Sequence, residues 1–425
     1  MGVLESLREW MPRQRWFAGK GHSPRLRLLD AQPDGPATRY LVMDDAGWLP
    51  TLYHVPLCHA SRPPAELTPV LEAAVVGPDD AGRVLLDAPR DPRYAADLLA
   101  RFGVEALPGG TRVLGGEQSN TSLVCATVDG PPVVVKLYRV LHHGENPDVT
   151  GQAALSSVGS RDVPRFVGQL GAIWPDIGRT DGVAAGTVAF AQEFVPDARP
   201  AWEVALDAAR RGEALDTAAA GIGAGVARIH HDLARALPTR PADEDDRAAI
   251  TGAWDRRLRI ALAEVPGLAE AEAGIAAVYA RAATESWPTL QRIHGDLHLG
   301  QVLAVPGGGW RFIDFEGEPM RPMAERSAPD LAPRDVAGML RSFDYAAGAA
   351  LGPGADPAWA RSARAAFLAG YASERGDAAA SGPLGEALEL DKAVYEAIYE
   401  SRNRPAWLPI PLAGIAAILA RGGTA

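Results

Sequence analysis

Cysteine is scarce in this sequence, and its scarcity excludes two kinds of small stabilised module. The chain of 425 residues has two cysteines, Cys58 and Cys125, which lie far apart and each among apolar residues. A disulfide framework needs more cysteines, and a structural zinc site needs Cys or His ligands at short fixed spacing. Neither pattern is present, so we expect hydrophobic cores to stabilise the fold.

Long apolar runs and an excess of basic residues are also missing. No stretch approaches the roughly 18 consecutive apolar residues of a membrane span, and Glu and Arg interrupt the apolar residues of the N-terminal segment, unlike a signal peptide. The 42 Lys and Arg residues against 53 Asp and Glu residues give a net charge of −11, without a local basic patch. Such a surface repels polyanions, so we expect no binding to nucleic acid. Because neither a membrane span nor a signal peptide is recognisable, we also expect a cytoplasmic protein that does not bind membranes.

The residues that are present predict several domains. Hydrophobic residues make up 47% and charged residues 22% of the chain, an ordinary globular composition, and about 150 residues per domain gives two to three domains. Strand-like runs between turn residues dominate the first half, and amphipathic helical patterns follow it. We predict a cap, a β-rich lobe and a helical lobe, at residues 1–105, 106–195 and 196–425.

Individual elements follow from the same patterns. Short runs rich in Val, Leu and Tyr predict strands, and apolar residues at three- and four-residue steps predict helices. Strands are expected at 39–43, 51–55 and 83–86, two or three within 111–138, and one at 186–195, with helices within 201–236, 242–285, 334–377 and 384–402.

The strongest functional signal is IHGDLHLGQVL, which is followed by WRFIDFEGEP. Asp296 follows His-Gly, Gln301 lies five positions later, and Asp314 follows a short apolar strand. Phosphoryl transfer needs a carboxylate that takes a hydroxyl proton, and an amide and a carboxylate that hold Mg²⁺ against the phosphates. We therefore predict Asp296 as the catalytic base and Gln301 and Asp314 as magnesium ligands. Glu316, two residues beyond Asp314 on the same side of the strand, is a candidate second metal or sugar contact.

An isolated His-Gly-Asp can also be a turn with a capping Asp, but further blocks accompany this one. Together with RDVAGMLRSFDYAA from Arg334, the two blocks resemble the maltokinase group within the aminoglycoside-phosphotransferase-like kinases. The resemblance extends to RQRWFAGK (13–20), GEQSNTS (116–122) and DKAVYEAIYESRNRPAWLPIPL (391–412), so it spans the chain. Actinobacterial glucosamine kinases are similar to the same group. The resemblance implies an α+β, bilobal protein-kinase-like fold with an N-terminal α/β cap, ATP, Mg²⁺ and a sugar acceptor.

The nucleotide side is expected in the β-rich lobe. Small and polar residues between two predicted strands let backbone N–H groups approach phosphate oxygens, and we assign this role to Gln118, Ser119 and Asn120. The segment is not a Walker A loop, because no Gly-Lys-Ser/Thr follows. Lys136 closes the apolar run 133–135 and is a candidate partner of the α- and β-phosphates, although a lysine at a strand end can also simply reach solvent.

Two further nucleotide assignments rest on position in the pattern. The strand that ends near Val195 resembles the interlobe hinge, where the backbones of Glu193 and Val195 would bond the adenine edge. In maltokinases, as the resemblance has it, an acidic residue after Asn-Pro-Asp pairs with the lysine, but here Val, Thr and Gly follow. Glu145 or Asp148 therefore takes this role, or the pairing is absent.

The acceptor side is expected on the last motif block. Residues four apart on a helix share a face, as Asp391 and Tyr395 do, and carboxylates with an aromatic ring suit a sugar. A simpler reading makes Lys392 and Glu396 a surface ion pair and the tyrosines core residues. The predicted sugar contacts are Asp296, His298, Asp391, Tyr395, Glu396, Glu400 and Trp407.

The identity of the sugar is less constrained than the reaction. Carboxylates crowd the acceptor blocks and would serve an ammonium group, so the leading prediction is glucosamine phosphorylated at its 6-hydroxyl. Maltose phosphorylated at its 1-hydroxyl is the alternative, followed by an aminoglycoside phosphotransferase or a pseudokinase that only binds. We expect a monomer or a weak homodimer.

Overall fold

The computed structural model describes residues 2–47, 49–61, 69–115, 120–318, 321–352, 357–375 and 382–422. The chain divides into two compact units. Unit 1 comprises Met1–Val149 and Arg165–Pro196, and unit 2 comprises Thr150–Pro164 and Asp197–Ala425. The chain first passes between them within helix α4 (Pro147–Ser157).

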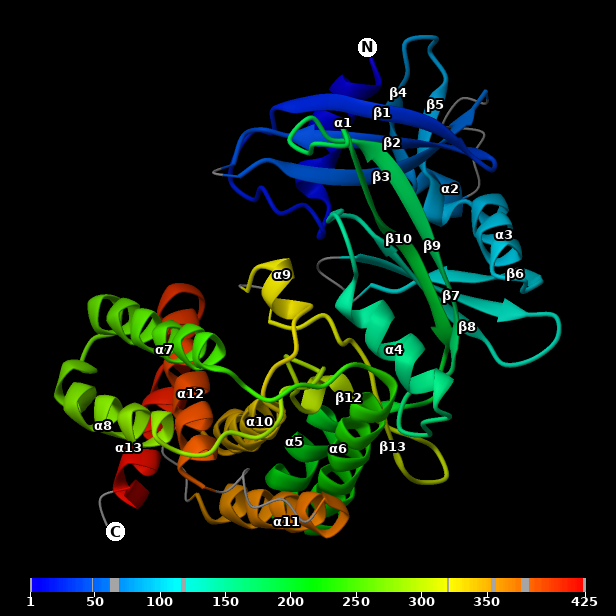
Figure 1. The fold of residues 1–425 in the computed structure, drawn as a ribbon. Helices are drawn as coiled ribbons and strands as arrows, with labels where there is room; N and C mark the ends of the chain where they lie inside the picture. The colour runs from blue at the N-terminus through cyan, green and yellow to red at the C-terminus, as the bar shows by residue number, and fades with distance from the viewer. Residues whose placement is uncertain are drawn as a thin grey trace. The chain divides into compact units, whose positions relative to one another are not determined.

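Unit 1 contains two antiparallel sheets of five strands (Figure 1). The first has the order β1-β2-β3-β5-β4, with β1 Leu26–Asp34, β2 Ala37–Asp44, β3 Thr51–Ala60, β4 Val75–Pro78 and β5 Val84–Asp87. Helices α1 (Val3–Trp10), α2 (Pro69–Glu72) and α3 (Pro92–Arg101) accompany this sheet. Trp16 and Phe17 are buried against Tyr53 of β3, so the aromatic residues of the N-terminal motif form the core of the cap.

The second sheet of unit 1 has the order β6-β7-β8-β10-β9. Its strands are β6 Ala106–Val113, β7 Asn120–Thr127, β8 Val133–Tyr138, β9 Phe166–Pro175 and β10 Val183–Glu193. Gly130, at φ 108°, makes the turn between β7 and β8. On β8, Lys136 lies opposite Phe190 of β10, in the interior of the sheet.

Unit 2 is mainly helical and has two hydrophobic cores. Helices α5 (Ala201–Arg211), α6 (Asp216–Ala236), α10 (Pro333–Leu351) and α11 (Ala358–Arg375) contribute to one core, and α7 (Glu244–Glu264), α8 (Glu272–Ala283), α12 (Pro383–Asn403) and α13 (Pro409–Gly422) to the other. The short elements are β11 (Arg199–Pro200), β12 (Val302–Ala304), β13 (Trp310–Phe312), α9 (Met323–Arg326), and the 3₁₀ turns Ala269–Ala271, Leu299–Gln301 and Pro405–Trp407. Among the helices that the structure describes, none is both long and apolar enough to cross a membrane.

Glycine allows α6 and α11 to cross at close range. A Cβ added at Gly370 would lie 2.0 Å from the Ala220 carbonyl oxygen, and one at Gly223 would lie 2.1 Å from the Phe367 carbonyl oxygen. Atoms cannot approach so closely, and so the two backbones pack directly against each other at these residues.

The observed elements follow the sequence pattern with local differences. The helical stretch 201–236 is interrupted at Gly212, whose φ of 66° ends α5. Strand β13 ends at Phe312, and Asp314 has a left-handed backbone with φ 72°. The expectation that Glu316 shares a strand face with Asp314 is therefore wrong.

Candidate active site

The loop that carries Asp296 is held by helix α10 of unit 2. The buried carboxylate of Asp335 accepts hydrogen bonds from the backbone N–H groups of His294 and Gly295, each at 2.8 Å. The Ser342 hydroxyl accepts a third from the N–H of Leu299, at 3.0 Å. Both ends of the HGDLHL segment are thus fixed to one helix, which restricts the movement of the residues between them.

Gly338 of α10 lies beneath the same loop. A Cβ at this position would lie 2.5 Å from the carbonyl oxygen of Leu297, the residue that follows Asp296. Glycine therefore lets the loop backbone lie directly on the helix, and a larger residue would displace it.

A buried histidine supports Asp335 from the opposite side. His230 Nε2 lies 3.0 Å from Asp335 Oδ2, and its Nδ1 lies 3.0 Å from the hydroxyl of Tyr371. Burial lowers the pKa of His230, although Asp335 opposes this effect, so the ring is neutral at pH 7. The ring then donates from Nε2 to Asp335 and accepts from Tyr371.

Asp296 lies beside Lys392, a residue of α12. Lys392 Nζ donates to Asp296 Oδ1 at 3.1 Å and to Glu318 Oε1 at 2.6 Å. Burial by itself would raise the pKa of Asp296, but the attraction of the Lys392 ammonium group opposes burial, and the pKa is lowered. Asp296 is therefore ionised at neutral pH and can accept a hydrogen bond from a hydroxyl group.

His298 has a defined orientation in the same loop. Its Nδ1 accepts the N–H of Gly300 at 3.0 Å, and burial lowers its pKa. The neutral ring consequently carries its proton on Nε2 and offers a hydrogen-bond donor. A donor next to a carboxylate suits the hydroxyl groups of a sugar.

Gln301 and Asp314 are brought together by the β12–β13 hairpin, in which Val302 pairs with Phe312. Gln301 Nε2 donates to Asp314 Oδ2 at 2.8 Å, and this contact leaves the amide oxygen of Gln301 as an acceptor. A left-handed non-glycine residue such as Asp314 is energetically unfavourable and is enriched at functional sites. Amide and carboxylate oxygens are the ligands that Mg²⁺ prefers, so this donor set fits that ion.

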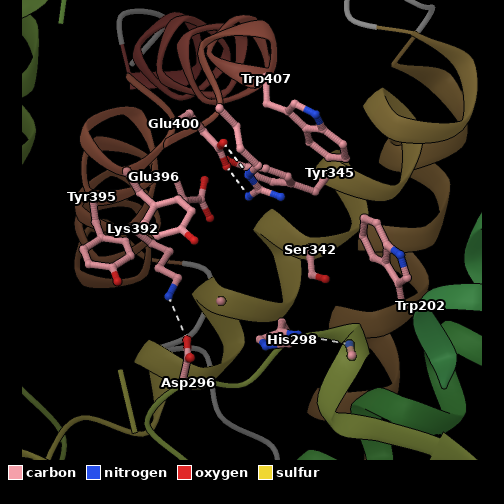
Figure 2. A pocket seen from close by; sticks show the side chains of 14 residues that line it. Trp202, Asp296, His298, Ser342, Tyr345, Lys392, Tyr395, Glu396, Glu400 and Trp407 are labelled. Carbon is pink, nitrogen blue, oxygen red and sulfur yellow. Dashed lines mark hydrogen bonds and ion pairs between the residues drawn. The ribbon is translucent and has the colours of Figure 1, made fainter. Parts of the chain in front are cut away.

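A cavity of about 610 Å³ opens beside Asp296 (Figure 2). It is lined by residues of α5, the Asp296 loop, α10, α12 and the segment that follows α12. The lining residues are Trp202, Asp296, His298, Gly300, Gly338, Ser342, Tyr345, Lys392, Tyr395, Glu396, Tyr399, Glu400, Arg404 and Trp407.

Carboxylates and aromatic rings also line the cavity away from Asp296. Glu400 accepts hydrogen bonds from Arg404, at 2.9 and 2.6 Å, and from the Tyr345 hydroxyl at 3.1 Å. The Tyr345 and Trp407 rings stack with their centroids 6.2 Å apart. Figure 2 shows Glu400, Tyr345 and Trp407 grouped together, apart from Asp296. A carboxylate beside aromatic faces can bind a polar or cationic ring compound.

Six of the seven predicted sugar contacts line this cavity, and Asp391 does not. The side chain of Asp391 is buried and forms ion pairs with Arg257 and Arg334. The prediction of Asp391 as a sugar contact is therefore corrected: it pairs with two partly buried arginines instead. Helix α12 is buried on most of its surface, so helical spacing alone could not identify the face that lines the cavity.

The simpler alternative, in which Lys392 and Glu396 form a surface ion pair, is contradicted by the structure. Glu396 instead accepts a hydrogen bond from Arg341 at 2.9 Å, whereas Lys392 contacts Asp296 and Glu318. Trp202, Tyr345 and Arg404 were also not identified as site residues. Tyr345 lies inside the recognised block RDVAGMLRSFDYAA, and Arg404 lies inside the recognised RNRPAW run, whereas no sequence signal singled out Trp202.

The candidate nucleotide residues lie in unit 1. Lys136 Nζ donates to Asp148 Oδ2 at 2.9 Å, and this aspartate has only 1% of its side chain exposed. Of the alternatives for the acidic partner, the structure thus shows Asp148. Asn120 begins β7 and is buried, whereas Gln118 and Ser119 lie outside the described residues.

The predicted hinge residues lie at the end of β10. The backbone N–H of Glu193 donates to the Arg165 carbonyl at 2.9 Å, so this N–H is not available to a nucleotide. Among the described residues, none accepts a hydrogen bond from the N–H of Val195. Of the two predicted hinge residues, Val195 is therefore the one whose backbone N–H is available to a nucleotide.

Comparison with known proteins places the chain among kinases. Residues 10–91 match the maltokinase N-terminal cap domain. The chain is 32% identical to the glucosamine kinase of Streptacidiphilus jiangxiensis over 354 residues, which cover 75% of this chain and 77% of that protein. It is 30% identical to the glucosamine kinase of Mycolicibacterium smegmatis over 342 residues, with 74% and 80% coverage.

Solved structures agree with these relatives. A glucosamine kinase in crystal form B matches with a TM-score of 0.72 and 26% identity, over 99% of this chain and 100% of that chain. A glucosamine kinase in complex with glucosamine, ADP and inorganic phosphate matches with a TM-score of 0.69 and 26% identity, over 97% and 99%. The fold is therefore that of the glucosamine kinases, with an N-terminal cap, and the prediction of an α+β kinase fold with such a cap is confirmed. The chain belongs to the glucosamine kinase family.

Proposed function

We propose that this protein transfers the γ-phosphate of ATP to the 6-hydroxyl of glucosamine. The observation that carries the proposal is the cavity in which an ionised Asp296 lies at one place and a carboxylate with aromatic rings at another. Glucosamine needs both features, because one hydroxyl must meet the base while an ammonium group meets a carboxylate. Membership of the glucosamine kinase family supports the same substrate.

The reaction is a direct transfer between two oxygens. Asp296 accepts the proton of the 6-hydroxyl as that oxygen forms a bond to the γ-phosphorus. The bond from the γ-phosphorus to the bridging oxygen breaks, and ADP leaves. His298 donates from Nε2 to a sugar hydroxyl, and the hydrogen bonds from the loop to Asp335 and Ser342 keep the base in position.

Gln301 and Asp314 would hold the magnesium ion, with Glu316 as a further candidate ligand. When bound, Mg²⁺ neutralises the charge of the phosphate groups. The chain's own contribution is the hairpin contact that presents the Gln301 amide oxygen and the Asp314 carboxylate together.

Lys136 is the candidate contact to the α- and β-phosphates, and Asp148 orients it. The N–H of Val195 and the carbonyl of Glu193 would bond the adenine edge. Asn120 would contribute to the phosphate-binding segment with Gln118 and Ser119.

One assay tests the substrate. The purified protein is incubated with ATP and Mg²⁺, and ADP release is measured with glucosamine, glucose, maltose and kanamycin in separate reactions. The expected result is the highest kcat/KM for glucosamine, and ³¹P NMR of the product should show a phosphate ester on C6. A higher kcat/KM for maltose or kanamycin would reject glucosamine as the substrate, and no ADP release with any sugar would favour a binding module.

A further inference from the structure

Lys392 lies at the reacting part of the cavity, yet the proposed reaction gives it no role. Its Nζ lies 3.1 Å from Asp296 Oδ1 and 2.6 Å from Glu318 Oε1, and 5.0 Å from the centre of the Tyr395 ring. Only 18% of the Lys392 side chain is exposed. Two carboxylates and an aromatic face therefore fix the position of this ammonium group.

The two carboxylate oxygens of Asp296 have different surroundings. Oδ1 accepts the hydrogen bond from Lys392, whereas no residue of the described ranges donates to Oδ2. A base needs one oxygen to receive the proton of a hydroxyl group. Lys392 thus occupies the oxygen that the reaction does not need and leaves the other for the acceptor.

Glucosamine brings a difficulty that a neutral sugar does not. Its ammonium group is a better partner for a carboxylate than any of its hydroxyl groups, because charge-assisted hydrogen bonds are about twice as strong as neutral ones. A fully accessible Asp296 would attract the ammonium group. The sugar would then bind with its nitrogen at the catalytic base and no hydroxyl group in position, which is an unproductive complex.

We propose that Lys392 is a specificity-determining residue that reserves Asp296 for a hydroxyl group by excluding the sugar's ammonium group from it. The inference rests on the proposed function, because it concerns how glucosamine is oriented. Lys392 acts by occupying Oδ1 and by repelling a second cation near Asp296.

The rest of the cavity offers the excluded ammonium group another position. Glu400 is held there by Arg404, whose side chain is 47% exposed while that of Glu400 is 2% exposed. An exposed arginine can leave its carboxylate at little cost, so the ammonium group can take its place beside Glu400. Lys392 cannot be displaced in the same way, because Glu318 is buried and also holds it.

Lys392→Met is the direct test, and calorimetry without nucleotide is the first measurement. In the variant, glucosamine should bind about tenfold more tightly, because its ammonium group gains Asp296, whereas glucose should bind within twofold of its wild-type affinity. In steady state with ATP, kcat and KM for glucosamine should fall together, as unproductive binding requires. Lys392→Arg keeps the positive charge and should retain the wild-type ratio of the glucosamine and glucose affinities.

The single variant leaves Glu318 buried without its cation, which can destabilise the fold. Lys392→Met with Glu318→Gln removes both charges and avoids this cost, and the same tighter binding of glucosamine is expected. Arg402→Met is the matched control, since Arg402 is a cation of the same helix whose exposed pair with Glu264 lies outside the cavity. It should leave both affinities unchanged.

Two results would overturn the inference. One is a Lys392→Met variant, single or double, whose kcat falls while its glucosamine affinity stays at the wild-type value, because Lys392 would then only orient Asp296. The other is an equal gain of affinity for glucose and glucosamine. Failure of the proposed function is distinguishable from both, since it requires that the wild-type protein does not phosphorylate glucosamine.

Discussion

Each unit of the molecule contains a lysine paired with an aspartate, and the two pairs differ in which partner is accessible. In unit 1, Lys136 and Asp148 lie 2.9 Å apart, with 11% and 1% of their side chains exposed. In unit 2, Lys392 and Asp296 lie 3.1 Å apart, with 18% and 24% exposed. The aspartate of the first pair is almost fully buried, whereas that of the second pair is partly exposed.

The same chemical pair therefore serves opposite purposes. In the proposed reaction, the buried anion Asp148 orients a lysine for a phosphate, and the cation Lys392 prepares an aspartate for a hydroxyl group. The accessible partner meets the substrate, and the other acts through it. In unit 1, substitution of the lysine should therefore reduce activity more than substitution of the aspartate. In unit 2, substitution of the aspartate should reduce activity more than substitution of the lysine.

The largest effect is expected for Asp296→Asn. The amide cannot take the hydroxyl proton, so kcat should fall by about 10³-fold, while Lys392 keeps its contact with Glu318 and the fold is retained. ADP release and binding of a fluorescent ATP analogue should be measured in parallel. Turnover within tenfold of wild type would remove Asp296 from the role of base.

Lys136→Met should have the next largest effect, on the nucleotide side alone. Loss of the phosphate contact should raise KM for ATP about tenfold and lower kcat by about 10- to 100-fold, with glucosamine affinity unchanged. Asp148→Asn should lose less, because it acts through the lysine. If Asp148→Asn were the more damaging of the two, the contrast between the pairs would be broken.

Trp407→Ala should have a moderate effect on the binding of glucosamine, and it tests a residue of unit 2 that lines the cavity but belongs to neither pair. The indole lines the cavity and stacks on Tyr345, so its loss removes an apolar face for the sugar ring. KM for glucosamine should rise about fivefold with kcat nearly unchanged. Trp359→Ala is the matched control, because Trp359 lies on α11 and does not line the cavity; an equal rise in KM there would indicate a general loss of structure.

The smallest effect concerns His54, a buried group of unit 1 whose Nδ1 lies 3.0 Å from the Tyr138 carbonyl oxygen. Burial and then Arg139 lower its pKa to about 4. Between pH 6.5 and about 4 the unfolded chain binds a proton that the folded chain does not, so the stability contributed by neutral His54 decreases as the pH falls through this range. Between pH 6.5 and about 4, the melting temperature of His54→Asn should therefore fall by a few degrees less than that of the wild-type protein. A steeper dependence in the variant would contradict the assignment.

The sequence predicts the site best where the functional residues are close neighbours. Gln301 and Asp314 are close in the sequence, and the β12–β13 hairpin brings their side chains into contact, so the motif alone predicts this pair. Lys392 and Asp335 reach the same loop through tertiary packing of α12 and α10, which spacing does not reveal. Most strands of unit 1 were predictable because their apolar runs are short and bounded by turn residues, but β1, β4 and β9 were not predicted. Both neighbours on α12, Asp391 and Lys392, are charged, and only the packing decides which of them faces the cavity.

Gly338 has a consequence for how sequence variants of this protein are interpreted. The height of the Asp296 loop above α10 is set by the absence of one methyl group, so Gly338→Ala would change the position of the base while every residue of the HGD and DFEGEP blocks stays in place. A search for those blocks would count such a chain as intact. Loss of activity can therefore arise in a chain whose HGD and DFEGEP blocks are complete, and this glycine belongs among the positions that are inspected when activity is inferred from sequence.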